Sequence, residues 1–489
     1  MEKLDPKFAE VKNYINGNFV PFTGDFLDVF SPENGEKISR VPLSTAKEVN
    51  EAVKAARNAY QTWSEMTIRD RSQIFFKYRE LLLKNSRELG QLLSIENGKT
   101  LPESIAEVSK SVEITEFACS LTQLAAGELL EVSKGIECRI EKKPVGVIAS
   151  IAPFNFPLMV PNWTIPIALV LGNTMVMKPS EVVPLSTIRI AELLQEAGLP
   201  DGVFNLVNGD KAVVEALCDN EGIDGLTFVG STKVAKIVYK RATATLKRVV
   251  CLGGAKNHLI VLPDANEAMA AADIAASMSG CCGQRCMAAS AMVGVGDVDH
   301  IVAKLVEESK KLIPGENLGA VTSKAAVERI EDYINQAEKD GAKILLDGRN
   351  CKVAGKDGGY YVGPTVIDHV TPQMSVAKEE IFGPVLSIMR TESVDDAIKI
   401  ENDNPYGNAA AVYTSNGGSA RYVMSKVSAG MVGVNIGVPV PREPFSFGGW
   451  NESKFGAGDI TGKSSVEFFT KPRKQTTKWS AKDKKDWMS

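Results

Sequence analysis

Apolar residues between Thr45 and about Leu130 recur every three or four positions, each beside charged neighbours. Ile74, Tyr78 and Leu81 follow this spacing. Side chains three and four residues apart lie on one face of a helix, so the pattern is typical of amphipathic helices that pack on a core. We therefore predict a helical region over this part of the chain.

The period changes to two around residues 129–152. Ile136, Cys138 and Ile140 alternate with charged residues, and a mostly apolar run without charged residues follows at Val145–Ile151. Alternation is typical of a strand with one face in water, whereas a continuous apolar run is typical of a strand buried on both faces. The pattern predicts a projecting β-hairpin and then a strand inside the core.

Short apolar runs alternate with helical stretches up to about residue 253, and a second such series extends from Lys256 to about Val440. This alternation favours parallel sheets flanked by helices. The predicted fold class is α/β, with two parallel-sheet units in tandem and the hairpin beside them. We expect strands at Thr174–Met177, Val203–Val207, Gly225–Val229 and His258–Val261 and near Ile344 and Leu386, and helices at Ser186–Ala197, Lys211–Cys218, Ala268–Ser279 and His300–Leu312.

The composition of the 489 residues, 44% hydrophobic and 24% charged, is that of a globular protein of several domains. The net charge of -4 supplies no basic field for nucleic acid, so we expect a small-molecule partner. The most apolar stretch, Phe156–Gly172, is interrupted by prolines, and the first residues lack the apolar segment of a secretory signal. Cysteines without a CxxC pair indicate a reducing compartment and no metal cage. We expect a cytoplasmic protein without a membrane partner.

One strand-to-helix connection is a candidate phosphate site. In the segment GLTFVGSTKVAKIV, a strand ends at Gly230, Ser231 and Thr232, where a helix begins. The first N–H groups of a helix have no partner within it, so a phosphate fits there. The sequence has no GxGxxG, so the standard dinucleotide-binding fingerprint is absent.

Three thiols lie within GCCGQRCMA at residues 280–288, and Arg285 directly precedes the last of them, Cys286. A guanidinium beside this thiol favours the thiolate, which is the nucleophilic form. The common alternative is a buried cysteine that acts only as a small hydrophobe. The three histidines do not adjoin Cys286 in sequence, so a Cys-His protease or a metal enzyme has little support. Thiol chemistry beside a nucleotide site remains.

Six segments occur in the order and spacing of aldehyde dehydrogenases. They are APFNFP at 152–157, MKPSE at 177–181, FVGST at 228–232, GQRCMA at 283–288, EEIFGPV at 379–385 and NPYG at 404–407. The resemblance covers nearly the whole chain and implies the aldehyde dehydrogenase fold. Within that superfamily, the sequences GQRCM, AKNH at 255–258, PVP at 439–441 and FSF at 445–447 are most similar to the CoA-acylating methylmalonate-semialdehyde dehydrogenases.

The resemblance implies that Cys286 attacks the aldehyde carbon. The amide of Asn155 and the backbone N–H of Cys286 would then stabilise the oxyanion of the thiohemiacetal. Without the resemblance, Asn155 between phenylalanines and prolines reads equally well as a turn residue.

The resemblance also assigns the cofactor site. Lys178 and Glu181 match the residues that bind the adenosine ribose, and Glu380 matches the residue that binds the nicotinamide ribose. A carboxylate at position 181 would repel a 2'-phosphate, so NAD is favoured over NADP. Lys178 and Glu380 could otherwise be ordinary solvated charges.

Four further residues belong to this implied cofactor site. Phe382 is expected near the nicotinamide, Phe154 is expected to contact the cofactor, and Gly230 and Ser231 are expected to face the pyrophosphate. No metal is expected.

One departure from the family pattern concerns the acyl acceptor. Hydrolytic members have ELGGK about 34 residues before the cysteine, and its Glu activates water, whereas this chain has CLGGAK with Cys251 and Leu252 at the candidate positions. A thioester without a local base should persist until a thiol attacks it, which argues for coenzyme A as co-substrate. Water activated by a distant group or by Cys251 is the alternative.

A second departure concerns the substrate anion. The subgroup is thought to bind it with two arginines, and this chain has Arg285 at one place but Lys110 at the other. Lysine keeps the charge and loses the planar fork that binds a carboxylate in two hydrogen bonds. We expect Lys110 and Arg285 to bind a short aldehyde bearing carboxylate, sulfonate or phosphate; alternatively, Lys110 is a solvated cation and Arg285 acts alone.

The resemblance implies a domain division and an assembly. Residues 1–128 and 146–253 would form the NAD-binding domain and 254–446 the catalytic domain, and 129–145 with 465–489 would form the oligomerisation element of a homotetramer. The favoured reaction is NAD-dependent oxidation of methylmalonate or malonate semialdehyde to an acyl-CoA with decarboxylation. Two alternatives are oxidation of another anionic aldehyde, such as a sulfonated one, to the free acid, and a catalytically silent binding protein.

Overall fold

The apolar run of residues 147–151 forms strand β7 in the middle of an eight-stranded sheet. The computed structural model describes residues 4–478. The strand order is β2-β1-β9-β8-β7-β10-β11-β21, and the pairs from β9 to β11 are parallel. The strands are β1 (Asn13–Ile15), β2 (Asn18–Val20), β7 (Val147–Ile151), β8 (Thr174–Lys178), β9 (Phe204–Leu206), β10 (Gly225–Val229), β11 (Arg248–Leu252) and β21 (Lys454–Phe455).

Helices cover both faces of this first sheet, because every central strand is apolar on both sides. One core contains residues of α1 (Ala46–Trp63), α8 (Lys211–Asp219) and α9 (Thr232–Ala244). The opposite core contains residues of α2 (Ile68–Lys84), α3 (Ser86–Asn97), α4 (Leu101–Cys119), α5 (Leu121–Leu124), α6 (Met159–Val170), α7 (Leu185–Glu196) and α16 (Ser464–Phe469). The predicted helical region therefore exists, and it ends at Leu124.

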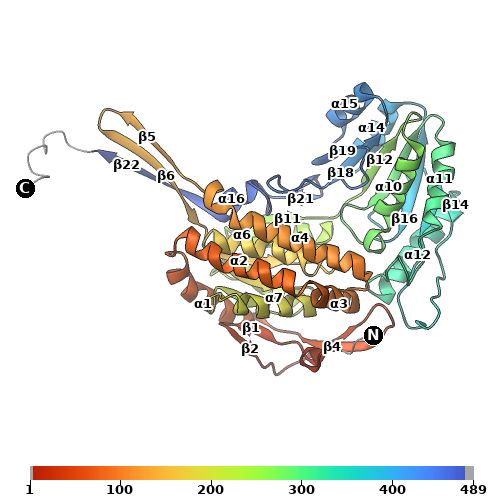
Figure 1. The fold of residues 1–489 in the computed structure, drawn as a ribbon. Helices are drawn as coiled ribbons and strands as arrows, with labels where there is room; N and C mark the ends of the chain where they lie inside the picture. The colour runs from red at the N-terminus through yellow and green to blue at the C-terminus, as the bar shows by residue number, and fades with distance from the viewer. Residues whose placement is uncertain (1–3, 479–489) are drawn as a thin grey trace, which may run out of the picture.

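A second, seven-stranded sheet has the order β14-β15-β16-β13-β12-β18-β19, parallel except for β14. Its strands are β12 (Asn257–Val261), β13 (Ala289–Val295), β14 (Lys343–Leu346), β15 (Thr365–Asp368), β16 (Val385–Thr391), β18 (Ala409–Tyr413) and β19 (Met431–Val434). Its helices are α10 (Glu267–Ser279) and α11 (Asp299–Ser309) on one face, and α12 (Lys324–Lys339), α13 (Ser375–Lys378), α14 (Val394–Asn402) and α15 (Gly417–Lys426) on the other. Figure 1 shows the two units beside each other.

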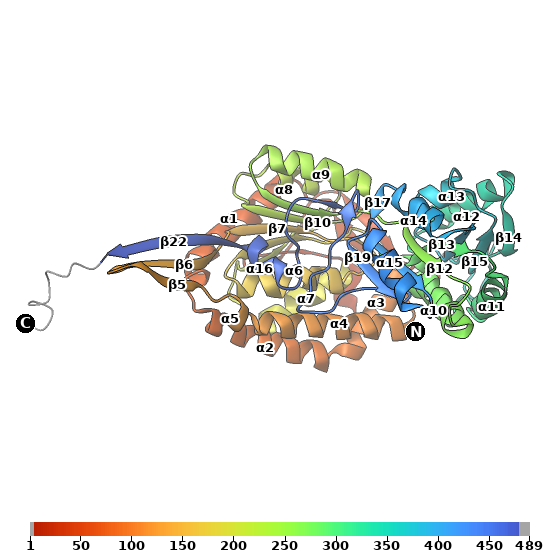
Figure 2. The same ribbon diagram turned by 90° about the horizontal axis from the view of Figure 1, so that it is seen from above.

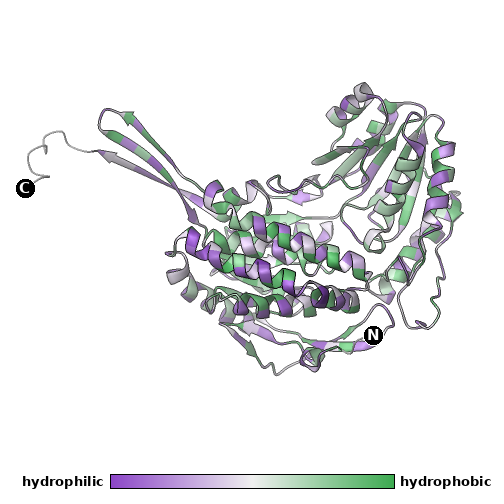
Figure 3. Cartoon of the chain, in the orientation of Figure 1, coloured by the Kyte–Doolittle hydropathy of each residue, from purple (hydrophilic) through white to green (hydrophobic). Residues whose placement is uncertain are grey.

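The predicted hairpin forms an arm that projects from the first unit (Figures 1 and 2). Strands β5 (Glu128–Ser133), β6 (Ile136–Pro144) and β22 (Thr470–Lys478) form its antiparallel sheet, in the order β22-β6-β5. Apolar and polar stretches both run along the arm (Figure 3), and Leu129 and Leu130 on its edge strand β5 are 67% and 66% exposed. Residues 1–3 and 479–489, which the predicted domain and oligomerisation ranges include, lie outside the described residues.

The predicted fold class is confirmed, and the predicted strand and helix positions agree with the observed ones to within a few residues. The strands before residue 45 were not predicted. They include β3 (Phe26–Phe30) and β4 (Lys37–Pro42), which pair with each other. Two of these strands, β1 and β2, have only three residues each, which is too short for a period to be read.

The two sheets present opposite ends to each other. Segments that follow β7, β8, β10 and β11 leave the carboxyl ends of the first sheet, and segments that precede β12, β13 and β16 enter the amino ends of the second. Asn155 follows β7 and bonds to Gln284, which precedes β13. The family motifs gather at this junction.

Candidate active site

Cys286 lies in the connection between α10 and β13. The connection turns sharply, because Cys281 and Cys282 both have φ of 52° and Gly283 has φ of 71°. A Cβ atom at Gly283 would lie 2.0 Å from the carbonyl oxygen of Gly383, so only glycine allows this close approach. The contact brings Cys286 beside the segment that precedes β16.

Amide groups surround the thiol. Two asparagine side chains fix the peptide of Cys286, as Nδ2 of Asn257 and of Asn408 donate to its carbonyl oxygen over 2.8 and 2.9 Å. Asn155 is buried, and its Nδ2 donates to the carbonyl oxygen of Gln284 over 2.9 Å. The amide of Asn155 is thus held in a fixed position, and a fixed amide donor is suited to stabilising an oxyanion. Asn408 and the role of Asn257 were missed, because no local motif connects them with Cys286.

The electrostatic surroundings keep the thiol protonated. Burial, and after it the charge of Glu380, raise the pKa of Cys286 to about 12, although Arg285 and the N–H groups of Cys286 and Met287 lower it. Arg285 acts in the expected direction and favours the thiolate, but burial outweighs it in the protein without bound molecules. The carboxylate of Glu380 raises the pKa of the thiol because it is a like charge near the developing thiolate.

Glu380 lies in the same small cavity as Cys286. Its Oε1 accepts a hydrogen bond from the backbone N–H of Ala255 over 2.9 Å. Burial raises the pKa of Glu380 to about 7, and the Ala255 N–H, Lys256 and Arg329 oppose the rise. Burial also lowers the pKa of Lys256 to about 7, and its Nζ has no hydrogen-bond partner among residues 4–478. Both groups therefore titrate near neutrality.

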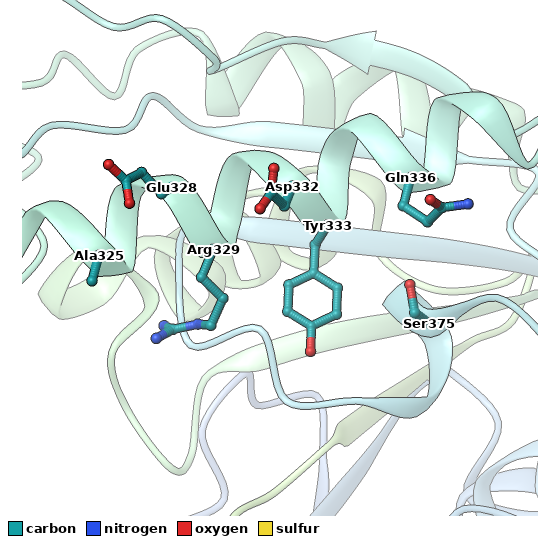
Figure 4. A pocket seen from close by; sticks show the side chains of 7 residues that line it. All are labelled: Ala325, Glu328, Arg329, Asp332, Tyr333, Gln336 and Ser375. Carbon is teal, nitrogen blue, oxygen red and sulfur yellow. The ribbon is translucent and has the colours of Figure 1, made fainter.

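Helix α12 holds the segment that carries Glu380. Figure 4 shows Arg329 and Tyr333 extending from this helix on the same side. The Tyr333 hydroxyl donates to Glu379 over 2.6 Å, and Arg329 Nη2 donates to the carbonyl oxygen of Ile381 over 3.2 Å. Their partners flank Glu380 on both sides, so these two side chains position it. The sequence reasoning missed both, because they lie about 50 residues away and on an ordinary amphipathic helix.

The predicted adenosine and phosphate residues lie at carboxyl ends of the first sheet. Lys178 is buried at the end of β8, and its Nζ donates to Glu181, which is partly exposed, over 2.6 Å. Ser231 precedes α9, is exposed, and its side chain makes no capping hydrogen bond. The N–H of Gly230 donates to the carbonyl oxygen of Leu252 over 3.1 Å. The first turn of α9 is thus open to an anion.

Phe154 and Phe382 contact each other across the junction of the two sheets. Their ring centroids lie 5.7 Å apart and the rings are nearly perpendicular, at 84°. Asn97 Nδ2 donates to the carbonyl oxygen of Phe154 over 2.8 Å, and Phe382 has φ of 56°. The structure therefore brings together two aromatic residues that the sequence places more than two hundred positions apart.

A cavity of about 650 Å³ opens on the other side of the thiol. Cys286 and Arg285 line it with Cys281, and the rings of Trp163 and Phe447 form an apolar wall with centroids 4.7 Å apart. The cavity is large enough for a short aldehyde, and charged residues line it beside this apolar wall. We take it as the substrate cavity.

Lys110 and Arg285 both line this substrate cavity, but each already has partners. Lys110 Nζ donates to Glu443 over 2.7 Å and to Glu113 over 3.0 Å. Arg285 Nη2 donates to two carbonyl oxygens in the last turn of α10 over 2.9 and 3.1 Å. The pairing of Lys110 was not foreseen, because Glu443 is 333 residues away in sequence.

The two candidate positions for a hydrolytic base lie on opposite faces of β11. Cys251 is fully buried in the core that contains α1, α8 and α9. Leu252 lies in the opposite core, against which Cys286 also packs. Burial raises the pKa of the Cys251 thiol far above its usual range. Neither side chain is placed and charged to activate water beside the thioester.

A family model described as the aldehyde dehydrogenase family matches residues 19–474. The chain belongs to this family. The aldehyde dehydrogenase is 44% identical over 478 residues to malonate-semialdehyde dehydrogenase 2 of Bacillus cereus, a match that covers 96% of this chain and 98% of the relative. The corresponding protein of Geobacillus kaustophilus is 43% identical over 478 residues, which is 96% of this chain and 99% of the relative.

Solved structures agree with this assignment. The methylmalonate-semialdehyde dehydrogenase DddC of Oceanimonas doudoroffii superposes with a TM-score of 0.95 at 41% identity, over 97% of this aldehyde dehydrogenase and 99% of that chain. A Sinorhizobium meliloti protein assigned to the same activity and solved with NAD gives 0.95 at 38% identity, over 98% and 99% of the two chains. No helix among residues 4–478 is long and apolar enough to cross a membrane.

Proposed function

We propose that this aldehyde dehydrogenase oxidises malonate or methylmalonate semialdehyde with NAD and transfers the resulting acyl group to coenzyme A. The names of the Bacillus, Geobacillus and Oceanimonas relatives support the substrate class. The observation that carries the choice of acyl acceptor is the end of β11, where Cys251 and Leu252 provide no carboxylate toward Cys286. A water molecule at the end of β11 therefore receives no base from either of these two positions.

The donor set fits NAD. Lys178 and Glu181 offer one cation and one carboxylate to a ribose, the open first turn of α9 suits a pyrophosphate, and Glu380 offers a second carboxylate near the thiol. Glu181 would repel a 2'-phosphate, which favours NAD over NADP. When bound, NAD accepts the hydride released by the substrate carbon.

The oxidation begins when the Cys286 sulfur attacks the aldehyde carbon. The carbonyl π electrons move to the oxygen, and the thiol proton passes to solvent water, so the oxyanion of a thiohemiacetal forms. The amide of Asn155 and the N–H of Cys286 donate to the resulting oxyanion. Loss of hydride from the carbon then leaves a thioester on Cys286.

The thioester leads to an acyl-CoA. The bond between the β-carboxylate and the α-carbon breaks, carbon dioxide leaves, and the electron pair on the α-carbon takes up a proton. The coenzyme A thiolate then attacks the thioester carbonyl and the Cys286 sulfur departs. In this step Cys286 is the leaving group, and the free thiol is regenerated when it takes up a proton.

A second candidate is oxidation of another anionic aldehyde, such as a sulfonated one, to the free acid. The presence of lysine at position 110 favours it, because an ammonium lacks the planar fork that binds a carboxylate in two hydrogen bonds. A homotetramer assembled through the β5, β6 and β22 arm and a cytoplasmic location complete the proposal. The exposed Leu129 and Leu130 support the assembly.

The decisive experiment identifies the acyl product with and without coenzyme A. We expect steady NADH formation from malonate semialdehyde only when coenzyme A is present, with acetyl-CoA and carbon dioxide as products. Equal turnover without coenzyme A, with a free acid as product, contradicts the acyl transfer. As a control, Cys286→Ala should abolish NADH formation and retain NAD binding, which separates loss of the nucleophile from loss of the fold.

A further inference from the structure

The substrate cavity contains an acidic side chain that competes for its lysine. Glu443 Oε2 lies 2.7 Å from Lys110 Nζ, and the side chains are 14% and 23% exposed. Glu113 lies 3.0 Å from the same ammonium, but it is 44% exposed and sits one helical turn along α4. Glu443 is therefore the better shielded of the two carboxylates, and its charge acts on the cavity through less solvent.

Unlike Lys110, Arg285 is not paired with a carboxylate among the described residues. Its Nη2 donates only to neutral carbonyl oxygens, and its buried Nε has no hydrogen-bond partner among the described residues. No carboxylate within the described chain forms a salt bridge with it. Three cations line the cavity: Lys110 is paired with carboxylates, whereas Arg285 and Arg442 form no salt bridge among the described residues and are available to a substrate anion.

We propose that Glu443 is a specificity-determining residue, which occupies the ammonium of Lys110 and so disfavours aldehydes that carry two negative charges. An anion that approaches Lys110 must lie beside the Glu443 carboxylate, and like charges at this separation repel. A doubly charged substrate experiences this repulsion twice, so phosphonate-bearing or phosphate-bearing aldehydes are disfavoured. The inference rests on the proposed function only in placing the substrate anion in this cavity.

The test uses three aldehydes of nearly the same shape that differ in charge. They are tert-butylacetaldehyde, which is neutral, sulfoacetaldehyde, with one negative charge, and phosphonoacetaldehyde, with two at alkaline pH. The kcat/KM of each is measured by NADH formation with the native chain, with Glu443→Gln and with the matched control Glu113→Gln. Ratios between substrates within one variant are independent of the fraction of active protein.

We expect the native chain to prefer the sulfonate to the phosphonate by about tenfold or more, and Glu443→Gln to reduce that ratio about tenfold. Glu113→Gln should change it less than about threefold, because solvent screens the more exposed charge. Lys110→Met should raise the ratio, since it leaves Glu443 without its cation. An unchanged or larger ratio in Glu443→Gln overturns the proposal, and so does a smaller ratio in Lys110→Met.

This outcome is distinguishable from failure of the proposed function. If malonate semialdehyde yields no acyl-CoA, the proposed function fails. The kcat/KM ratios among the three aldehydes still test the role of Glu443 as long as the sulfonate and the phosphonate are oxidised. If acyl-CoA forms and the ratios do not move, the role of Glu443 fails alone.

Discussion

The carboxyl group of Glu380 accepts a hydrogen bond from the backbone N–H of Ala255 over 2.9 Å and lies in the small cavity that Cys286 lines, where it is negatively charged above a pH of about 7. This arrangement joins the amino ends of β12 and β16 beside the nucleophile. The carboxylate therefore influences the reactivity of the thiol before any cofactor binds.

Removal of that charge should activate the thiol. Glu380 raises the pKa of Cys286, so Glu380→Gln should lower it and speed alkylation by iodoacetamide about tenfold at mildly alkaline pH, for a shift of one pKa unit. Arg285→Met should slow alkylation, because the guanidinium acts in the opposite direction. The rate is measured by mass spectrometry on the peptide that carries Cys286. A slower reaction in Glu380→Gln would contradict the assigned sign.

A carboxylate at position 252 should make coenzyme A dispensable. Leu252 belongs to the core against which Cys286 packs, so Leu252→Glu places a base on the side of the thioester. We expect NADH formation without coenzyme A to rise by about a hundredfold, as general bases typically provide. Cys251→Glu is the matched control on the opposite face of β11 and should only destabilise the chain. A Leu252→Glu protein that folds and still requires coenzyme A would refute this account of the acyl acceptor.

The buried ion pair between Lys99 and Glu107 should be important for stability. The two side chains are 2% and 0% exposed, and Glu107 also accepts hydrogen bonds from the N–H groups of Leu158 and Met159 over 2.9 Å each. Lys99→Met leaves a buried carboxylate without its cation and should lower the free energy of unfolding by about 3 to 5 kcal/mol.

The measurement is urea unfolding, with an exposed pair as control. Lys304 and Glu307 are 36% and 64% exposed, so Lys304→Met should lower the free energy of unfolding far less than Lys99→Met does, because solvent screens the pair. Equal losses in the two variants would show that burial of the Lys99 pair has no special effect.

Cofactor preference should depend on Glu181. Its carboxylate bonds to Lys178 over 2.6 Å at the end of β8. Glu181→Gln removes a charge that repels a 2'-phosphate and frees the ammonium, so the ratio of kcat/KM for NADP to that for NAD should rise about tenfold or more. Glu196→Gln, an equal charge change at the exposed end of α7, should leave the ratio unchanged. A ratio that rises equally in both variants would point to overall charge instead.

The arm should control assembly. Leu130 is 66% exposed on β5, whose outer edge has no partner strand among the described residues. Leu130→Glu should shift the protein from a tetramer to smaller species in light scattering after size-exclusion chromatography. Leu246→Glu, at an apolar side chain that is 94% exposed elsewhere, should leave the mass unchanged. A native monomer would rule out the proposed role of the arm.

The sequence alone predicted the α/β class, most of the central strands and the family motifs, because these depend on residue period and on short local patterns. It also predicted that Cys286, Asn155 and Glu380 belong to one active site, because the segments that contain them have the order and spacing of aldehyde dehydrogenase motifs.

The tertiary structure alone decided which charges meet. Glu443 reaches Lys110 from 333 residues away, Arg329 and Tyr333 hold the Glu380 segment, and the two faces of β11 separate Leu252 from Cys251. Such pairs arise when separate sheets and loops pack together, and no local period records them. The availability of each charge to a substrate depends on these distant partners, so it follows from the packed fold and not from the motif that contains the residue.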